Sequence, residues 1–227
     1  MRLTPLGLRE ILIATLCTAV AAALSAWAAV AVSPAWWAAA GIVTIVWLWV
    51  LWFFRDPRRT PPEGSGLFVS PADGRVSDVT PVGAESELGC PGVRIGVFMN
   101  VFNVHVNRLP CDGRVADVTH TPGAFLDARR PEARERNESA SIRLVHRRGG
   151  REYPVVVRQV AGLIARRIVT NLSPEQQVER GRRFGMIKWG SRLELFLPVE
   201  LEGEIRVRPG RRVRAGETVL FRTQEEE

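Results

Sequence analysis

A Gly-Ser pair in the last fifth of the chain is the first candidate for chemistry. Gly190 and Ser191 lie in F-G-M-I-K-W-G-S-R-L-E-L-F-L-P (184–198), between two runs typical of strands. A turn there would hold the serine hydroxyl over the preceding carbonyl. Gly190 has no Cβ, so it permits backbone conformations and close approach that other residues resist. Most Gly-Ser pairs are ordinary turns, so the pair alone does not establish a reactive site.

A serine hydroxyl needs a base before it can attack a carbonyl, and the sequence offers few bases. One of the three histidines, His105, lies among apolar residues typical of a strand, where a lone histidine is often a hydrogen-bonded core residue. His120 stands beside T-P-G-A-F and could line a pocket, whereas His146 falls in an arginine-rich H-R-R-G-G hairpin and is expected in solvent. Lys188 is the alternative base, which would make the chain a serine peptidase.

The cysteines and the charge narrow the class of partner. Cys17, Cys90 and Cys111 are far apart and form no C-x-x-C, so neither a metal site nor a disulfide framework is expected. The net charge of +7 is compatible with nucleic acid or with an anionic membrane surface. No helix-turn-helix, zinc or aromatic-basic RNA motif occurs, so the sequence favours the membrane surface and no nucleic acid.

The N-terminal part, residues 1–54, differs from the rest because its residues 11–54 are almost free of charge. Its apolar runs 11–32 and 35–54 each have about the length of a helix that crosses a bilayer. The second run directly after the first favours a transmembrane hairpin over a cleaved signal peptide; a buried hairpin in a soluble protein is the alternative. Arginines lie just outside both ends: Arg2, Arg9, Arg55, Arg58 and Arg59. The positive-inside tendency then places both ends, and the following domain, in the cytoplasm.

The remainder reads as a linker and a mainly β domain. Residues 55–66 are rich in Pro and Gly and suit neither a helix nor a strand interior. From 67 to 227, short β-branched and aromatic runs alternate with turn residues, which predicts strands. The expected strands include 67–69, 93–99, 153–160, 164–169, 193–197 and 219–221. Their strand–Gly turn–strand units resemble lipoyl/biotinyl-like β-sandwiches, so we expect a mainly β hybrid domain of that kind after the two-helix hairpin.

Six segments, taken in order along the chain, carry a resemblance to a known family. The set is similar to the phosphatidylserine decarboxylases of the short proenzyme form (type A, archaeal-type). The segments are F-F-R-D-P-R-R (53–59), S-P-A-D-G (70–74), F-N-V-H-V-N-R-L-P (102–110), P-G-A-F-L-D-A (122–128), Q-V-A-G-L-I-A-R-R-I-V (159–169) and the W-G-S segment.

The resemblance implies a reaction and a cofactor. Members of this family cut themselves before the serine of the Gly-Ser pair, which here gives a β chain 1–190 and an α chain 191–227. Ser191 would then remain as a covalent pyruvoyl group. This cofactor would form a Schiff base with the serine headgroup of phosphatidylserine and accept the electrons left when carbon dioxide departs, giving phosphatidylethanolamine. The matching residues imply His105 as base and acid and Asp73 as the carboxylate that orients it. No metal is required.

This chain departs in two ways from the long-form enzymes of the same family. The departures leave open which residue serves self-cleavage and which serves decarboxylation. Those enzymes carry Leu-Gly-Ser-Thr where this chain has Trp-Gly-Ser-Arg, and they have a second histidine where Arg108 falls. Either His105 serves both cleavage and decarboxylation, or Arg108, Asn107 or His120 takes one task. Arginines suit bidentate phosphate contacts. The candidates for substrate binding are His120, Asn107, Arg108, Arg166, Arg167 and Arg192.

The expected protein is therefore a carboxy-lyase of a bacterial or archaeal cell membrane, with its catalytic domain on the cytoplasmic side. Its two chains would stay together, and the resemblance makes a homodimer an expected assembly. Archaetidylserine differs only away from the reacting headgroup and is an alternative substrate. A non-catalytic, membrane-anchored lipoyl-like adaptor would explain the hairpin and the strands but not W-G-S beside Asp73 and His105. A peptidase would retain Ser191 in an intact chain.

Overall fold

The computed structural model describes residues 2–130, 132–163, 167–188 and 190–224. It divides into two compact units, Met1–Pro57 and Arg58–Glu227.

The first unit is a pair of apolar helices. A short 3-10 turn, η1 (Pro5–Gly7), leads into α1 (Leu8–Ala31), and α2 (Trp36–Phe53) returns beside it. Trp47 Nε1 donates to Thr15 Oγ1 at 3.0 Å and links the two helices. Both are long and apolar enough to cross a bilayer. Most of their large apolar side chains are exposed, whereas a helix in a soluble core would bury them. The expected pair of span-length apolar helices is confirmed.

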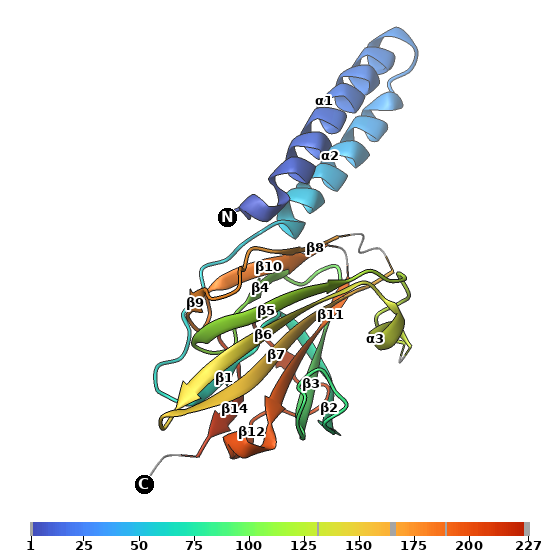
Figure 1. The fold of residues 1–227 in the computed structure, drawn as a ribbon. Helices are drawn as coiled ribbons and strands as arrows, with labels where there is room; N and C mark the ends of the chain where they lie inside the picture. Colours follow the sequence, from blue (N-terminus) through green and yellow to red (C-terminus); the bar gives the residue numbers. More distant parts are fainter. Residues whose placement is uncertain (1, 131, 164–166, 189, 225–227) are drawn as a thin grey trace. The chain divides into compact units, whose positions relative to one another are not determined.

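The second unit is built on one antiparallel sheet of eight strands in the order β13-β2-β3-β11-β7-β6-β5-β9. The sheet is strongly curled (Figure 1), so the strands enclose an interior. The expected mainly β domain is confirmed. The strands are β2 (Gly74–Val82), β3 (Gly92–Met99), β5 (Gly113–Thr121), β6 (Ser139–Arg148), β7 (Arg151–Ala161), β9 (Gln177–Val178), β11 (Ser191–Pro198) and β13 (Arg212–Val213).

Two sheets of three strands complete this unit. One has the order β1-β14-β12, with β1 (Leu67–Val69), β14 (Val219–Thr223) and β12 (Gly203–Ile205); the other has the order β4-β10-β8, with β4 (Val106–Arg108), β10 (Arg183–Ile187) and β8 (Ile168–Thr170). Short helical turns α3 (Ala133–Arg136) and η2 (Val199–Leu201) follow β5 and β11. β1 has the expected bounds. Of the expected strand 164–169, residues 164–166 lie outside the described residues.

β11 is the strand that positions the Gly-Ser pair. It runs antiparallel between β3 and β7, and Ser191, its first residue, is opposite Met99 on one side and Ala161 on the other. Alternate residues point to opposite faces of a strand. Leu193, Leu195 and Leu197 belong to the main core, and Ser191 shares their face. The serine therefore points into the interior of the curled sheet.

Candidate active site

The Gly-Ser pair has two unusual features. Gly190 has φ +71°, a left-handed conformation that favours glycine. A Cβ there would meet only Val101 Cγ1, at 3.9 Å, so the backbone and not the available space requires glycine. Ser191 is completely buried, and its Oγ has no hydrogen-bond partner among the described residues. Burying an unpaired hydroxyl costs about 1–3 kcal/mol. An unpaired hydroxyl of this kind indicates a role other than stability.

His105 is a base that is hydrogen-bonded to this pair. It lies in the loop before β4 and is fully buried. Its Nδ1 is 3.0 Å from the carbonyl oxygen of Asn103, and the amide N–H of Gly190 donates to its Nε2 at 3.2 Å. A carbonyl oxygen can only accept, so Nδ1 carries the ring hydrogen and Nε2 presents its lone pair. The basic nitrogen thus faces the residue whose carbonyl precedes Ser191.

Asp73 lies in the turn before β2 and has strong partners of its own. Its Oδ2 accepts from Arg59 Nη2 at 2.8 Å, and its Oδ1 accepts from the amide of Ala215 at 2.7 Å. The Asn103 carbonyl, bonded to Nδ1, is the group that fixes the His105 ring in these contacts. The orienting role expected for Asp73 stays a prediction.

Two buried amides extend the polar interior. Gln159 Nε2 donates to Asn107 Oδ1 at 2.8 Å, and both residues are fully buried. Gln159 Oε1 has no partner among the described residues. On β7, Gln159 shares a face with Ala161, which is opposite Ser191, so both unpaired oxygens lie on the inner side of the sheet. Asn107 was a sequence candidate. Gln159 was missed, although a Gln heading the apolar run Q-V-A-G is a usable signal.

A glycine after β7 controls the space around the Gly190 carbonyl. A Cβ on Gly162 would stand 2.3 Å from the carbonyl oxygen of Gly190, which no real side chain tolerates. Only glycine at 162 therefore lets this carbonyl take its present position. Sequence reasoning missed this residue too, because a close backbone approach leaves no periodic pattern.

The other candidates lie in varied surroundings. Arg108 is buried and donates through Nη1 to the Gly181 carbonyl at 2.9 Å. Lys188 follows β10 and is also buried. His120, on β5, is half exposed, with Nε2 3.5 Å from Glu138 Oε1. Arg167 is exposed. Arg166 lies outside the described residues, and substrate binding by any of this group stays a prediction.

The outer face of β11 contrasts with the inner one. Arg192 pairs with Asp78, and its Nε is 2.8 Å from Glu194 Oε1. Arg94 adds a 3.0 Å pair to Asp78. Gly96 has no side chain to fill the space that the Arg192 guanidinium occupies. Burial raises the pKa of Asp78, but the charge of Arg192 and the hydrogen bonds from Ser77 and Arg94 outweigh it, so the pKa lies below its usual value. Arg192 is thus engaged in this cluster.

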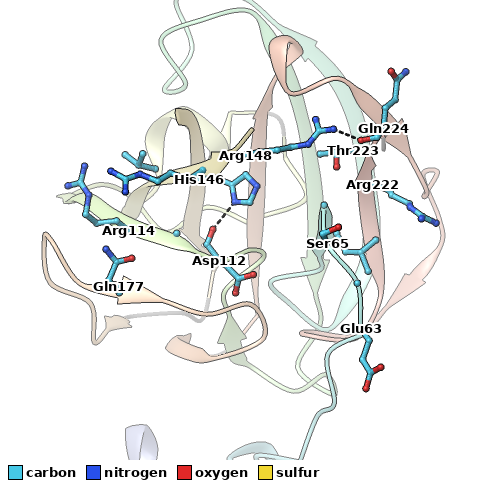
Figure 2. A pocket seen from close by; sticks show the side chains of 16 residues that line it. Glu63, Ser65, Asp112, Arg114, His146, Arg148, Gln177, Arg222, Thr223 and Gln224 are labelled. Atoms are coloured by element: carbon cyan, nitrogen blue, oxygen red, sulfur yellow. Dashed lines mark hydrogen bonds between the residues drawn. The ribbon is translucent and has the colours of Figure 1, made fainter. Parts of the chain in front are cut away.

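A cavity of about 900 Å³ lies elsewhere, between β5, β6 and β14 (Figure 2). His146 Nδ1 bonds the Asp112 carbonyl there at 2.8 Å, and Arg148 donates to the carbonyls of Leu201 and Gln224. Its cations are engaged by the protein itself, and none of its lining residues belongs to the Ser191 site. No group of three His, Cys, Asp or Glu within the described ranges suits a metal ion.

Comparisons with known proteins agree on one family. The family model described as phosphatidylserine decarboxylase matches residues 47–221. A phosphatidylserine decarboxylase proenzyme of Syntrophus aciditrophicus is 48% identical over 76% of this chain and 79% of its own length. Those of Zymomonas mobilis (44% identical; 77% of this chain, 76% of its own) and Rhodopirellula baltica (41%; 96% and 87%) are also similar.

Proposed function

The chain belongs to the phosphatidylserine decarboxylase family, and we propose that it makes its own pyruvoyl cofactor by cutting itself between Gly190 and Ser191. Family membership makes it a carboxy-lyase that acts on a phospholipid. The observation that carries the proposal is the hydrogen bond from the Gly190 amide to His105 Nε2, next to a buried serine hydroxyl that has no partner among the residues that the structure describes.

The chain's own residues supply the parts for cleavage. His105 Nε2 exchanges its bond to the Gly190 N–H for the Ser191 hydroxyl and takes its proton. The oxygen attacks the Gly190 carbonyl carbon, the amide C–N bond breaks, and the nitrogen recovers a proton, leaving an ester between residues 190 and 191. Loss of the Ser191 α proton then breaks the Cβ–Oγ bond and releases the Gly190 carboxylate. Hydrolysis consumes one water and releases one ammonia, which leaves a pyruvoyl group at 191.

The surroundings of position 191 fit this group. A pyruvoyl carbonyl, once formed, supplies the electron acceptor for decarboxylation of a substrate amine. Complete burial of position 191 keeps it out of bulk solvent, while single water molecules such as the one that hydrolysis consumes can still enter. His105 Nε2 is expected to hold the proton that the substrate carbon receives after carbon dioxide leaves. Gln159 Oε1, which no described residue pairs with, offers an acceptor for the substrate ammonium.

We assign phosphatidylserine as the substrate and the cytoplasmic side of the membrane as the location of the catalytic domain. The span-length helices and the arginines outside their ends support this orientation. Asp73, by holding Arg59 and the Ala215 amide, ties the linker and the α-chain segment to the turn before β2.

Intact mass spectrometry of the purified chain tests the proposal. We expect chains 1–190 and 191–227, the smaller one reducible by borohydride and lacking a free N-terminal amine, together with carbon dioxide release from phosphatidylserine vesicles. Ser191→Ala should give one full-length, inactive chain. Ser139→Ala, which removes another buried hydroxyl, is the matched control and should cleave normally. A full-length wild-type chain, or an α chain that keeps serine and its amine, would contradict the proposal. Parallel vesicles of archaetidylserine distinguish the ether-linked substrate.

A further inference from the structure

Large exposed apolar side chains are rare in the second unit. Among its described residues they are Phe102 (61% exposed), Leu163 (65%) and Val199 (65%). Scattered exposed residues need no explanation. Two of these three, however, come from loops that meet at the scissile bond.

Distances place both loops at that bond. Phe102 follows Val101, whose Cγ1 is 3.9 Å from where a Cβ on Gly190 would stand. Leu163 follows Gly162, which is in close contact with the Gly190 carbonyl. The Phe102 loop also carries the Asn103 carbonyl that holds His105. Val199 lies beyond the other end of β11, eight residues and about 26 Å along the chain from Ser191.

Exposed cations accompany the two apolar residues. Ala128 Cβ is 3.5 Å from where a Cβ on Gly162 would stand, and the chain continues from it to exposed Arg129 and Arg130. Arg129 is paired with Asp127, whose pKa its hydrogen bonds lower to about 2. Arg130 and Arg167 are exposed as well, Arg130 two residues after Ala128 and Arg167 four residues after Leu163 along the chain. Apolar tips among arginines are typical of segments that enter a bilayer interface.

We propose that Phe102 and Leu163, flanked by Arg130 and Arg167, form a rim around the Ser191 site that inserts into the interface of an anionic phospholipid bilayer. This inference rests on the proposed function. A substrate headgroup must reach a fully buried residue while its acyl chains stay in the bilayer. The rim lets the domain admit the headgroup without exposing the lipid chains to water.

The test uses full-length protein in phosphatidylcholine nanodiscs and two forms of phosphatidylserine. One form lies within the bilayer, and the other is a short-chain lipid dissolved in water. Phe102→Ser/Leu163→Ser is expected to lower the decarboxylation rate on phosphatidylserine within the bilayer about tenfold. The rate on water-soluble, short-chain phosphatidylserine should stay at the wild-type level. Val199→Ser, equally exposed in the native protein, should change neither rate. The rim would be overturned if the double variant decarboxylated bilayer phosphatidylserine at the wild-type rate. It would also be overturned if the variant lost the same factor on both substrates.

A second readout does not depend on catalysis. The labelling background is Cys17→Ser/Cys90→Ser, in which the remaining cysteine, Cys111, is buried and does not react with the label. An environment-sensitive fluorophore can then be attached at Phe102→Cys or at Val199→Cys. In uncut Ser191→Ala protein in anionic nanodiscs, the probe at 102 should shift to the blue relative to the probe at 199. Matching spectra would reject the rim. A blue shift at 102 together with a wild-type chain that stays uncut and releases no carbon dioxide would reject the proposed activity and leave the rim standing.

Discussion

Ser191 and Arg192 are neighbours on one strand, yet their surroundings are opposite in kind. Ser191 faces inward, where neither its hydroxyl nor Gln159 Oε1 has a partner within the described part of the chain. Arg192 faces outward into a buried cluster in which Asp78 and Glu194 balance it. Buried polar groups in native proteins are nearly always paired. The outer face therefore stabilises the strand, while the inner face keeps hydrogen-bonding capacity for a reaction.

The largest expected effect lies on the inner face. His105→Gln keeps an amide in place of the imidazole but removes the base, so self-cleavage should slow by about 100- to 10,000-fold. The fraction of uncut chain on a denaturing gel over time measures it. His146→Gln is the control. His146 also bonds a carbonyl through Nδ1, that of Asp112, and it makes no contact with the Gly190–Ser191 bond among the described residues. Equal cleavage by the two variants would remove His105 from the mechanism.

On the outer face we expect a loss of stability without a loss of chemistry. Arg192→Met leaves Glu194 buried, with Arg94 and Arg134 still 3.8 Å away. The free energy of unfolding should fall by about 1–3 kcal/mol. Urea unfolding in detergent micelles, in the uncut His105→Gln background, measures this change. Arg147→Met breaks an exposed pair with Glu152 and should stay within about 0.5 kcal/mol. A stability unchanged by Arg192→Met would refute the assigned role of the cluster.

Gly162→Ala tests the position of the scissile carbonyl. Its new Cβ must displace the Gly190 carbonyl, so cleavage should slow about tenfold through misplacement of the electrophile. The cleavage half-time after a denatured chain is refolded reports the change. Gly113→Ala creates a comparable contact, 2.6 Å from the Val145 carbonyl oxygen, away from this bond. That control should lose stability but cleave at the normal rate.

The smallest effect has the opposite sign to that of Arg192→Met. Removing an unpaired buried hydroxyl relieves a desolvation penalty, so Ser191→Ala should raise the free energy of unfolding by about 1 kcal/mol. The reference is again the uncut His105→Gln chain. Ser139→Ala should lower stability, because Ser139 Oγ accepts a hydrogen bond from Arg158 Nη2 at 3.3 Å. If Ser191→Ala were equally destabilising, the contrast between the two faces of β11 would fail.

The sequence predicted the local features of the fold well and its long-range contacts poorly. Apolar length revealed both helices, and β-branched runs revealed β1, β3 and β11, because each depends on a short stretch of chain. The eight-strand order follows from pairings between distant segments, which periodicity does not encode.

In the candidate site, too, the sequence predicted features that depend on a local motif and missed those that depend on distant segments. Motif resemblance singled out His105, and the structure adds the Asn103 carbonyl as its partner, a backbone group with no sequence signal. Gln159 and Gly162 stood within a recognised motif, but their roles depend on what lies across the strand from them. The outer cluster was unpredictable because its members come from four separate strands and helices.

The position of β11 in the middle of the sheet determines what a cut at Gly190 does to the molecule. Residues 191–227 supply β11 between β3 and β7, β14 between β1 and β12, and β13 beside β2. After cleavage the two polypeptides are interwoven, and the shorter one has no sheet of comparable size of its own. Refolding would then require two separate polypeptides to associate in solution and to insert several strands of one between strands of the other. With the proposed cut, maturation would therefore be irreversible: the proenzyme would fold as a single chain, and the cut enzyme would last because it unfolds slowly.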